Sequence, residues 1–149
     1  MEKEGRMKLQ DRVAVVTGGA SGIGAASAIA MAAQGARVVV GDLNEAAADG
    51  VRERIQRGGG QALAMRADVT RAVDNRALVE RAVSAWGRLD VFYANAGVPQ
   101  WKMDLEAVED AVYDRIMDVN VKGVWLGAKF ALPVMKRAKR GVLLRLALA

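Results

Sequence analysis

The sequence contains no cysteine and no histidine. The chain therefore forms no disulfide, and zinc sites built from these side chains and catalysis by an imidazole are excluded; no metal site is expected. Aromatic residues make up only 5% of the 149 residues, whereas Gly occurs 16 times. Small side chains suit close packing of helices on a sheet better than they suit the core of a β-sandwich.

No long apolar run is present either, because Lys or Arg interrupts each apolar stretch. The sequence thus predicts no membrane-spanning helix. Residues 1–11 are charged and lack the apolar segment of a secretory signal. We therefore expect a cytoplasmic protein without a membrane partner, whose residues 1–8 are disordered.

Positive charge is in excess, with a net charge of +5, but it is concentrated near one predicted helix end. Four basic residues account for most of it: Lys136, Arg137, Lys139 and Arg140. The rest of the chain carries no basic stripe of the kind that binds a phosphate backbone. A basic cluster is typical of a solvated helix carboxyl terminus, so no nucleic-acid partner is expected.

Short apolar runs alternate with longer helical patterns along the whole chain. Strands are predicted at 12–17, 37–41, 62–65, 89–94 and 142–146, and helices at 23–34, 44–57, 74–86 and 108–137, with a bend near Pro133. The strands lack polar alternation, as expected when helices cover both faces of a parallel sheet. The pattern predicts one α/β domain over residues 1–149, a doubly wound (Rossmann) sheet.

A glycine-rich loop joins the first predicted strand to the first helix. Its key residues are Gly18, Ser21, Gly22, Ile23 and Gly24. Glycines let the backbone turn sharply and approach a ligand, and the helix N-terminus offers free N–H groups to an anion such as a pyrophosphate. The spacing is neither G-x-G-x-x-G nor a P-loop, and the alternative is a tight turn without a ligand.

Polar residues also follow the next three predicted strands. Asp42 ends the second strand, where a carboxylate can accept hydrogen bonds from a ribose and would repel a 2′-phosphate, which favours NAD over NADP. The alternative is that Asp42 caps the next helix. Asp68-Val69 and Asn95-Ala96-Gly97 follow the third and fourth strands; each alone is an ordinary Asx turn.

Together these motifs resemble the short-chain dehydrogenase/reductase family over roughly residues 9–141. The motifs are Thr17-Gly18-x-x-x-Gly22-Ile23-Gly24, Asp42, Asp68-Val69, Asn95-Ala96-Gly97 and Asn120. The resemblance implies that the glycine loop holds the pyrophosphate and nicotinamide side of NAD and that Asp42, next to Leu43, holds the adenosine ribose. It also implies that Asp68 and Val69 flank the adenine, and that Asn95, Ala96 and Gly97 touch the cofactor.

Asn120 matches the helix Asn that holds a water in the family's proton relay; the alternative is that its side chain bonds locally to backbone and bends the helix. The resemblance further implies alcohol/carbonyl interconversion on a small-molecule substrate, and a homo-oligomer formed through the helix at 111–137. The family's Tyr-x-x-x-Lys pair is absent, because Tyr93 is followed by Gly97 and Tyr113 by Met117.

Residues 141–149 form an atypical tail where the family places its fifth strand and catalytic Ser. We interpret the chain as truncated before the catalytic residues, and expect it to be inactive alone. The alternatives are a nucleotide-binding module without catalysis and a non-functional fragment. Ordinary core packing is expected for Trp101, Met103 and Trp125.

Overall fold

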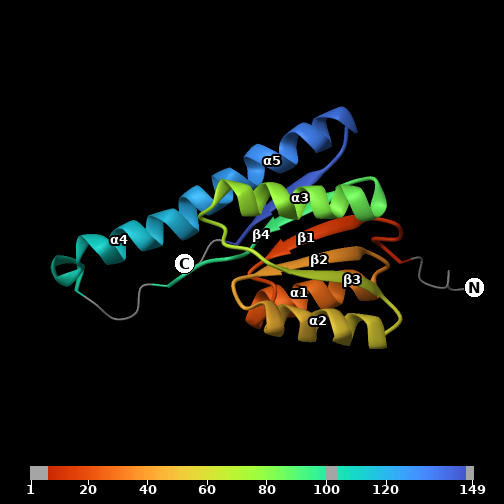
Figure 1. Ribbon diagram of the computed structural model, residues 1–149, viewed down its shortest axis with the longest axis horizontal. Coiled ribbons are helices and arrows are strands. Elements are labelled where there is room, and N and C mark those ends of the chain that lie inside the picture. The colour runs from red at the N-terminus through yellow and green to blue at the C-terminus, as the bar shows by residue number, and fades with distance from the viewer. Residues whose placement is uncertain (1–6, 100–103, 147–149) are drawn as a thin grey trace, which may run out of the picture.

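Five strands form one parallel sheet in the computed structural model, which describes residues 7–99 and 104–146. The strands are β1 (Val13–Thr17), β2 (Arg37–Asp42), β3 (Gln61–Arg66), β4 (Val91–Ala94) and β5 (Val142–Arg145), in the order β3-β2-β1-β4-β5. Each neighbouring pair is parallel. The predicted doubly wound parallel sheet is thus confirmed (Figure 1).

Helices cover both faces of the sheet, as the uninterrupted apolar strands require. Helices α1 (Gly22–Ala33) and α2 (Glu45–Arg57) lie on one face, and α3 (Ala72–Trp86) and α5 (Gly123–Arg137) on the other (Figure 1). Between β4 and α5 the chain forms the 3-10 turn η1 (Leu105–Ala107), helix α4 (Asp110–Met117) and the π-helical segment η2 (Asp118–Lys122). The helix type therefore changes at η2. Helix α5 continues through Pro133, where the sequence predicted a bend.

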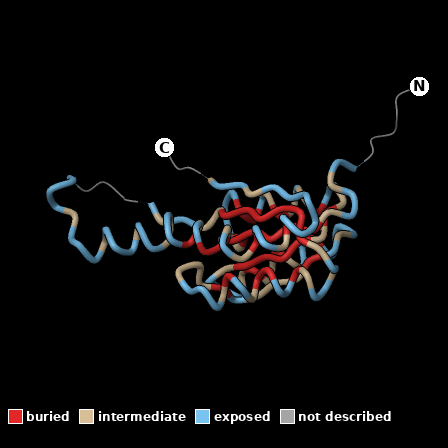
Figure 2. Tube along the Cα trace, turned by 90° about the horizontal axis from the view of Figure 1, so that it is seen from above, coloured by how far each residue is buried: buried red, intermediate tan, exposed pale blue. Residues whose placement is uncertain are grey.

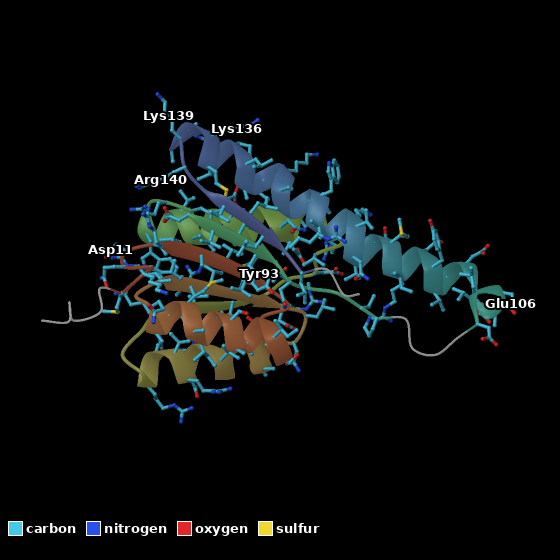
Figure 3. The ribbon with its side chains drawn as sticks, turned by 180° about the vertical axis from the view of Figure 1, so that it is seen from behind. Asp11, Tyr93, Glu106, Lys136, Lys139 and Arg140 are labelled. Atoms are coloured by element: carbon cyan, nitrogen blue, oxygen red, sulfur yellow. The ribbon has the colours of Figure 1, made fainter. Side chains whose placement is uncertain are left out.

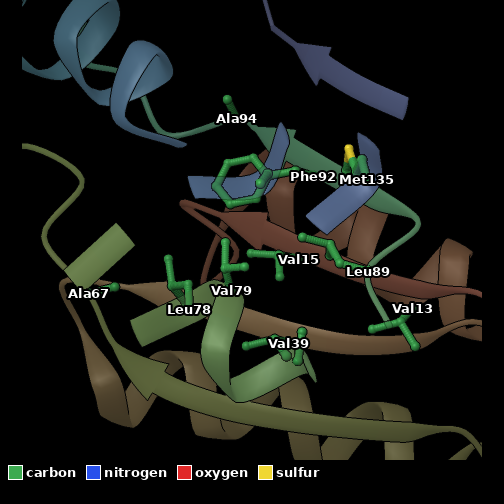
Figure 4. Packing of buried hydrophobic residues seen from close by; sticks show 12 residues of the cluster. Val13, Val15, Val39, Ala67, Leu78, Val79, Leu89, Phe92, Ala94 and Met135 are labelled. Carbon is green, nitrogen blue, oxygen red and sulfur yellow. The ribbon is translucent and has the colours of Figure 1, made fainter. Parts of the chain in front are cut away.

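Two apolar clusters, one on each face, hold the layers together. Val15 of β1 and Phe92 of β4 are fully buried beneath α3 and α5, with Met135 of α5 among their neighbours (Figure 4). A Cβ on Gly127 would overlap the Phe92 ring, so the glycine lets α5 lie directly on β4. Figure 2 shows the buried positions gathered in the sheet and the inner faces of its helices.

The fourth strand begins later than predicted. Leu89 and Asp90 precede β4, and Asp90 N–H donates to the Val13 carbonyl at 2.8 Å before ladder pairing begins at Val91. The predicted start at residue 89 is wrong. Leu89 is buried in the core, which explains its apolar side chain, but it does not pair with β1.

The helix formed by α4, η2 and α5 extends well beyond the carboxyl end of the sheet (Figures 1 and 2). Its outer surface exposes apolar side chains four residues apart: Tyr113 is 56% exposed, Met117 38%, Val121 51% and Trp125 57%. The expectation of core packing is wrong for Trp125, because no element lies over this side of the helix in the described residues. Figure 3 shows Lys136 and Lys139 near the opposite end of the helix from Glu106.

Several sequence-based expectations fall on residues 1–6, 100–103 and 147–149, outside the described part of the chain. They concern Trp101, Met103, the disordered extension and the last positions of the tail. Lys8 lies within the described part, and its N–H donates to the Gln34 side chain at 3.2 Å. Within residues 7–99 and 104–146, no helix is both long and apolar enough to cross a membrane.

Candidate functional site

A cavity of about 1160 Å³ opens at the carboxyl ends of the strands. All the residues that the sequence analysis assigned to cofactor binding line it: Gly18, Ser21, Gly22, Ile23, Gly24, Asp42, Leu43, Asp68, Val69, Asn95, Ala96 and Gly97. Parallel strands bring these loops together because their carboxyl ends share one edge of the sheet. The volume exceeds the roughly 300–1000 Å³ typical of small-molecule sites, so an extended ligand would fit.

The glycine loop forms one wall of the cavity and has no room for side chains at two positions. Gly18 has a φ of +63°, and a Cβ there would lie 2.8 Å from Ala96 Cα. A Cβ on Gly24 would overlap the Gly18 carbonyl oxygen and the Asn95 amide nitrogen. The glycines therefore allow α1 to start directly against the end of β4.

The first turn of α1 supplies main-chain donors to this wall. Ser21 is the N-cap residue, its side chain makes no capping hydrogen bond, and the first turn contains no acidic residue. The N–H groups of a first helical turn have no intrahelical acceptor, and the helix dipole makes this end positive. The wall formed by Gly22, Ile23 and Gly24 is therefore suited to an anion.

Asn95 ties the end of β4 to the glycine loop. Its Nδ2 donates to the carbonyl oxygens of Thr17 and Gly18, both at 3.0 Å. The Thr17 Oγ1 accepts the N–H groups of Asn95 and Ala96, both at 3.2 Å. These bonds are not those of an isolated Asx turn, and the Asn95 Oδ1 is buried without a partner among the described residues.

Asp42 is held between two loops at the edge of the cavity. Its Oδ2 accepts the Ala20 N–H at 3.0 Å and its Oδ1 accepts the Asn44 N–H at 3.0 Å. The cap of α2 is Asn44, whose Oδ1 accepts the Ala47 N–H at 3.1 Å. The helix-capping alternative for Asp42 is therefore wrong, because Asn44, two residues later, takes the cap position.

Asp68 forms the Asx turn considered as its alternative role. Its Oδ1 accepts the N–H of Thr70 at 2.9 Å and the hydroxyl of Thr70 at 2.7 Å. Burial raises the pKa of Asp68, but the Thr70 hydrogen bonds and the nearby Arg66 and Arg71 outweigh it, so the pKa lies below its ordinary value. The cavity wall therefore carries an ionised carboxylate at neutral pH.

Asn120 does not line the cavity but holds a segment that does. Its Oδ1 accepts the Val98 N–H at 2.8 Å, and its Nδ2 donates to the Val98 carbonyl at 2.9 Å. The alternative of local backbone bonding is wrong, since Val98 is 22 residues away. The side chain projects from the π-helical segment η2, a type of irregularity often found at functional sites.

The sequence analysis missed a second group of lining residues: Ala67, Thr70, Val98, Pro99, Ala111, Asp114, Arg115, Asp118, Val119 and Leu146. Those of α4 and η2 recur every three or four residues, which places them on one helix face. That periodicity is visible in the sequence, but only the structure shows that this face meets the cavity. Within the ranges that the structure describes, no group of acidic side chains could hold a metal ion.

Comparison with known proteins gives a consistent result. Residues 12–147 match the family described as short chain dehydrogenase. An uncharacterised oxidoreductase of Methylorubrum extorquens is 50% identical over 125 residues, covering 83% of this chain and 50% of the relative. The cis-4-hydroxycyclohexanecarboxylate dehydrogenase of Sinomonas cyclohexanicum is 44% identical over 133 residues, covering 89% of this chain and 53% of the relative.

A solved structure of a metagenomic short-chain oxidoreductase in complex with NADP has the same fold. It superposes with a TM-score of 0.88 and 34% identity, over 95% of this chain and 64% of that one. The chain thus spans about half the length of the curated relatives that it matches.

Proposed function

Because this chain belongs to the short-chain dehydrogenase family, we propose that it binds NAD as the cofactor-binding half of an alcohol/carbonyl oxidoreductase. One observation carries the proposal: a single cavity joins the positive end of α1 to the Asp42 carboxylate. A dinucleotide needs anion donors and a ribose acceptor within one extended site, and this arrangement provides both.

The residues present fit the cofactor. The side-chain position of Gly22, the first residue of α1, has no atom within 4 Å, so this glycine leaves open space beside the α1 donors, where the diphosphate would bind. The Asp42 carboxylate would accept from the adenosine ribose, because each of its oxygens has a second lone pair beyond the bond it already makes. Asp68 and Val69 would flank the adenine, while Asn95, Ala96 and Gly97 would stabilise the central strand and touch the cofactor.

NAD is favoured over NADP in this proposal. A 2′-phosphate would lie against the negative charge of Asp42, and the adjacent Gly41 and Leu43 offer no cation to offset it. Arg66 is the register partner of Asp42 on β3. We therefore expect Asp42→Ala to weaken NAD binding. The variant should also discriminate less against NADP, because the cation of Arg66 would remain on the neighbouring strand after the carboxylate is removed.

Hydride transfer is the chemistry that NAD supplies, and it requires a proton donor or acceptor at the substrate oxygen. Tyr93 does not serve, because it is buried in the core, and Tyr113 lies exposed on α4. Neither is followed by a lysine four residues later. We therefore propose that this chain binds NAD without turning over a small alcohol or ketone, and that Asn120 contributes by holding the Val98 segment.

The test is a titration of the full chain with NAD and NADP, followed by thermal unfolding and calorimetry. A native-state ligand at 100 times its Kd stabilises by about 2.7 kcal/mol, enough for a clear rise in Tm. NADH oxidation with a panel of ketones is expected to be absent. No stabilisation by any adenine nucleotide would overturn the binding proposal, and robust turnover that survives Tyr93→Phe and Tyr113→Phe would overturn the proton argument.

A further inference from the structure

Two consecutive N–H groups of the glycine loop are bonded to the end of β2. Gly19 N–H donates to the Gly41 carbonyl at 3.2 Å, and Ala20 N–H donates to Asp42 Oδ2 at 3.0 Å. A Cβ on Gly19 would lie 2.8 Å from the Val40 side chain, so the loop lies tightly against β2. The first half of the loop is therefore positioned from β2, and Ala20 is held by a side chain.

The Asp42 carboxylate is itself fixed from the opposite side. Its Oδ1 accepts the Asn44 N–H at 3.0 Å, at the start of α2. Each carboxylate oxygen thus accepts from a main-chain N–H, and the two donors belong to different loops. The carboxylate therefore connects the β1–α1 loop to the β2–α2 loop. Charge-assisted hydrogen bonds of this kind are about twice as strong as neutral ones.

The bond to Ala20 also determines which donors remain for a ligand. The Gly19 and Ala20 N–H groups point to β2, so the N–H groups available to an anion are those that follow, from Ser21 onward. If the Ala20 bond is lost, the loop before α1 still has the Gly19 bond and the Asn95 bonds at Thr17 and Gly18, but no bond holds the residue next to the α1 N-cap. The donors at the α1 terminus would then be less well placed.

We propose that Asp42 is a positioning residue for the anion-binding loop, in addition to facing the ribose. The inference rests on the proposed nucleotide binding for its ligand, but the contact to Ala20 exists in the chain itself. Asp42 should therefore affect the binding of a diphosphate even when the ligand offers no ribose hydroxyl. A residue that only reads the ribose would leave such a ligand unaffected.

The experiment compares ADP with 2′,3′-dideoxy-ADP on the full chain and on Asp42→Ala. The proposal expects dideoxy-ADP to bind about tenfold more weakly to the variant, the effect of losing one charge-assisted hydrogen bond. Asp42→Asn, which keeps one acceptor oxygen, should recover part of this loss. Unchanged dideoxy-ADP affinity in Asp42→Ala, with weaker ADP binding, would leave Asp42 as a ribose reader and overturn the proposal.

Two controls separate positioning from unfolding and from loss of charge. Glu45→Ala removes a nearby exposed carboxylate in the first turn of α2, and should leave dideoxy-ADP binding unchanged. Amide hydrogen exchange needs no ligand: Asp42→Ala should accelerate exchange at Ala20 and leave Val15 in β1 protected. Equal protection of Ala20 in both proteins would overturn the proposal, whereas failure of the parent chain to bind any nucleotide would overturn the proposed function instead.

Discussion

Replacing Asp90 by Asn should destabilise the chain more than any exposed charge substitution. The Asp90 side chain is only 6% exposed and accepts the Val13 N–H at 2.9 Å. Arg88 donates to both of its oxygens, at 2.7 and 2.6 Å. Arg12 and Arg140 approach Oδ1 at 3.4 and 3.5 Å. One carboxylate thus connects β1, β4 and the turn before β5.

The expected cost follows from these contacts. Removing one partner of a fully buried ion pair costs about 3–5 kcal/mol, but the arginines here are partly exposed and keep some hydration. The hydrogen bonds lost are charge-assisted, at about 1.5–3 kcal/mol each when unmade. We therefore expect Asp90→Asn to lower the free energy of unfolding by about 3 kcal/mol at pH 7.

The pH dependence gives an independent check on the cause. Burial raises the pKa of Asp90, but the hydrogen bonds from Arg88 and Val13 and the charges of Arg88 and Arg12 outweigh it, so the pKa lies below its ordinary value. A carboxyl group with a lowered pKa in the folded state stabilises fully above its unfolded pKa of about 3.9. This stabilisation is lost as the pH falls below that value and through the folded pKa, so parent and variant should converge there.

Urea unfolding at several pH values measures both effects. The matched control is Asp11→Asn, which removes the exposed partner of Arg37 at a position where φ is +60° and Asn is tolerated. That pair should contribute under about 1 kcal/mol. The reasoning fails if Asp90→Asn costs no more than Asp11→Asn, or if its cost persists undiminished in acid.

Three further predictions concern the cavity and the long helix. Gly24→Ala should abolish NAD binding and lower Tm, because its Cβ would overlap neighbouring atoms. Its control, Gly50→Ala in the middle of α2, meets no atom and should stabilise the chain by about 0.5–1 kcal/mol. Calorimetry measures NAD binding of the two variants, and thermal unfolding measures their Tm. Asn120→Ala should lower the free energy of unfolding in urea by about 1 kcal/mol, since it removes two hydrogen bonds to the half-buried Val98 main chain; an unchanged midpoint would contradict this. Trp125→Glu should reduce self-association in sedimentation, because it breaks the exposed apolar stripe on α4–α5; identical sedimentation of both proteins would count against an interface there.

The order of strands and helices could be predicted from the sequence because burial on both faces leaves a strong local signal. Val13–Thr17 is buried at every position, and such a run between helical patterns has few other interpretations. The start of β4 could not be predicted, because Leu89 is as apolar as a strand residue yet packs in the core before pairing begins. The exposure of Trp125 depends on what covers α5, which no local pattern records.

The cavity-lining residues were predictable for a different reason. Loops after parallel strands share one edge, so Gly18, Asp42, Asp68 and Asn95 had to lie near one another once the sheet was assigned. Their partners were not predictable. The contacts of Asp42 with Ala20 and of Asn120 with Val98 each cross 22 residues and depend on backbone groups, which every residue carries alike.

These long-range contacts show how the loops in the cavity wall keep their shape beside the helices that form the rest of it. Asn95 ties the end of β4 to the glycine loop, and Asn120 holds Val98 from the long helix. The glycine loop is in turn bonded to Asp42. The glycine loop and the Val98 segment are thus each held by a side chain that belongs to a different element. A site preformed in this way loses little conformational entropy when a ligand binds, so its affinity depends on the donors it presents rather than on a rearrangement.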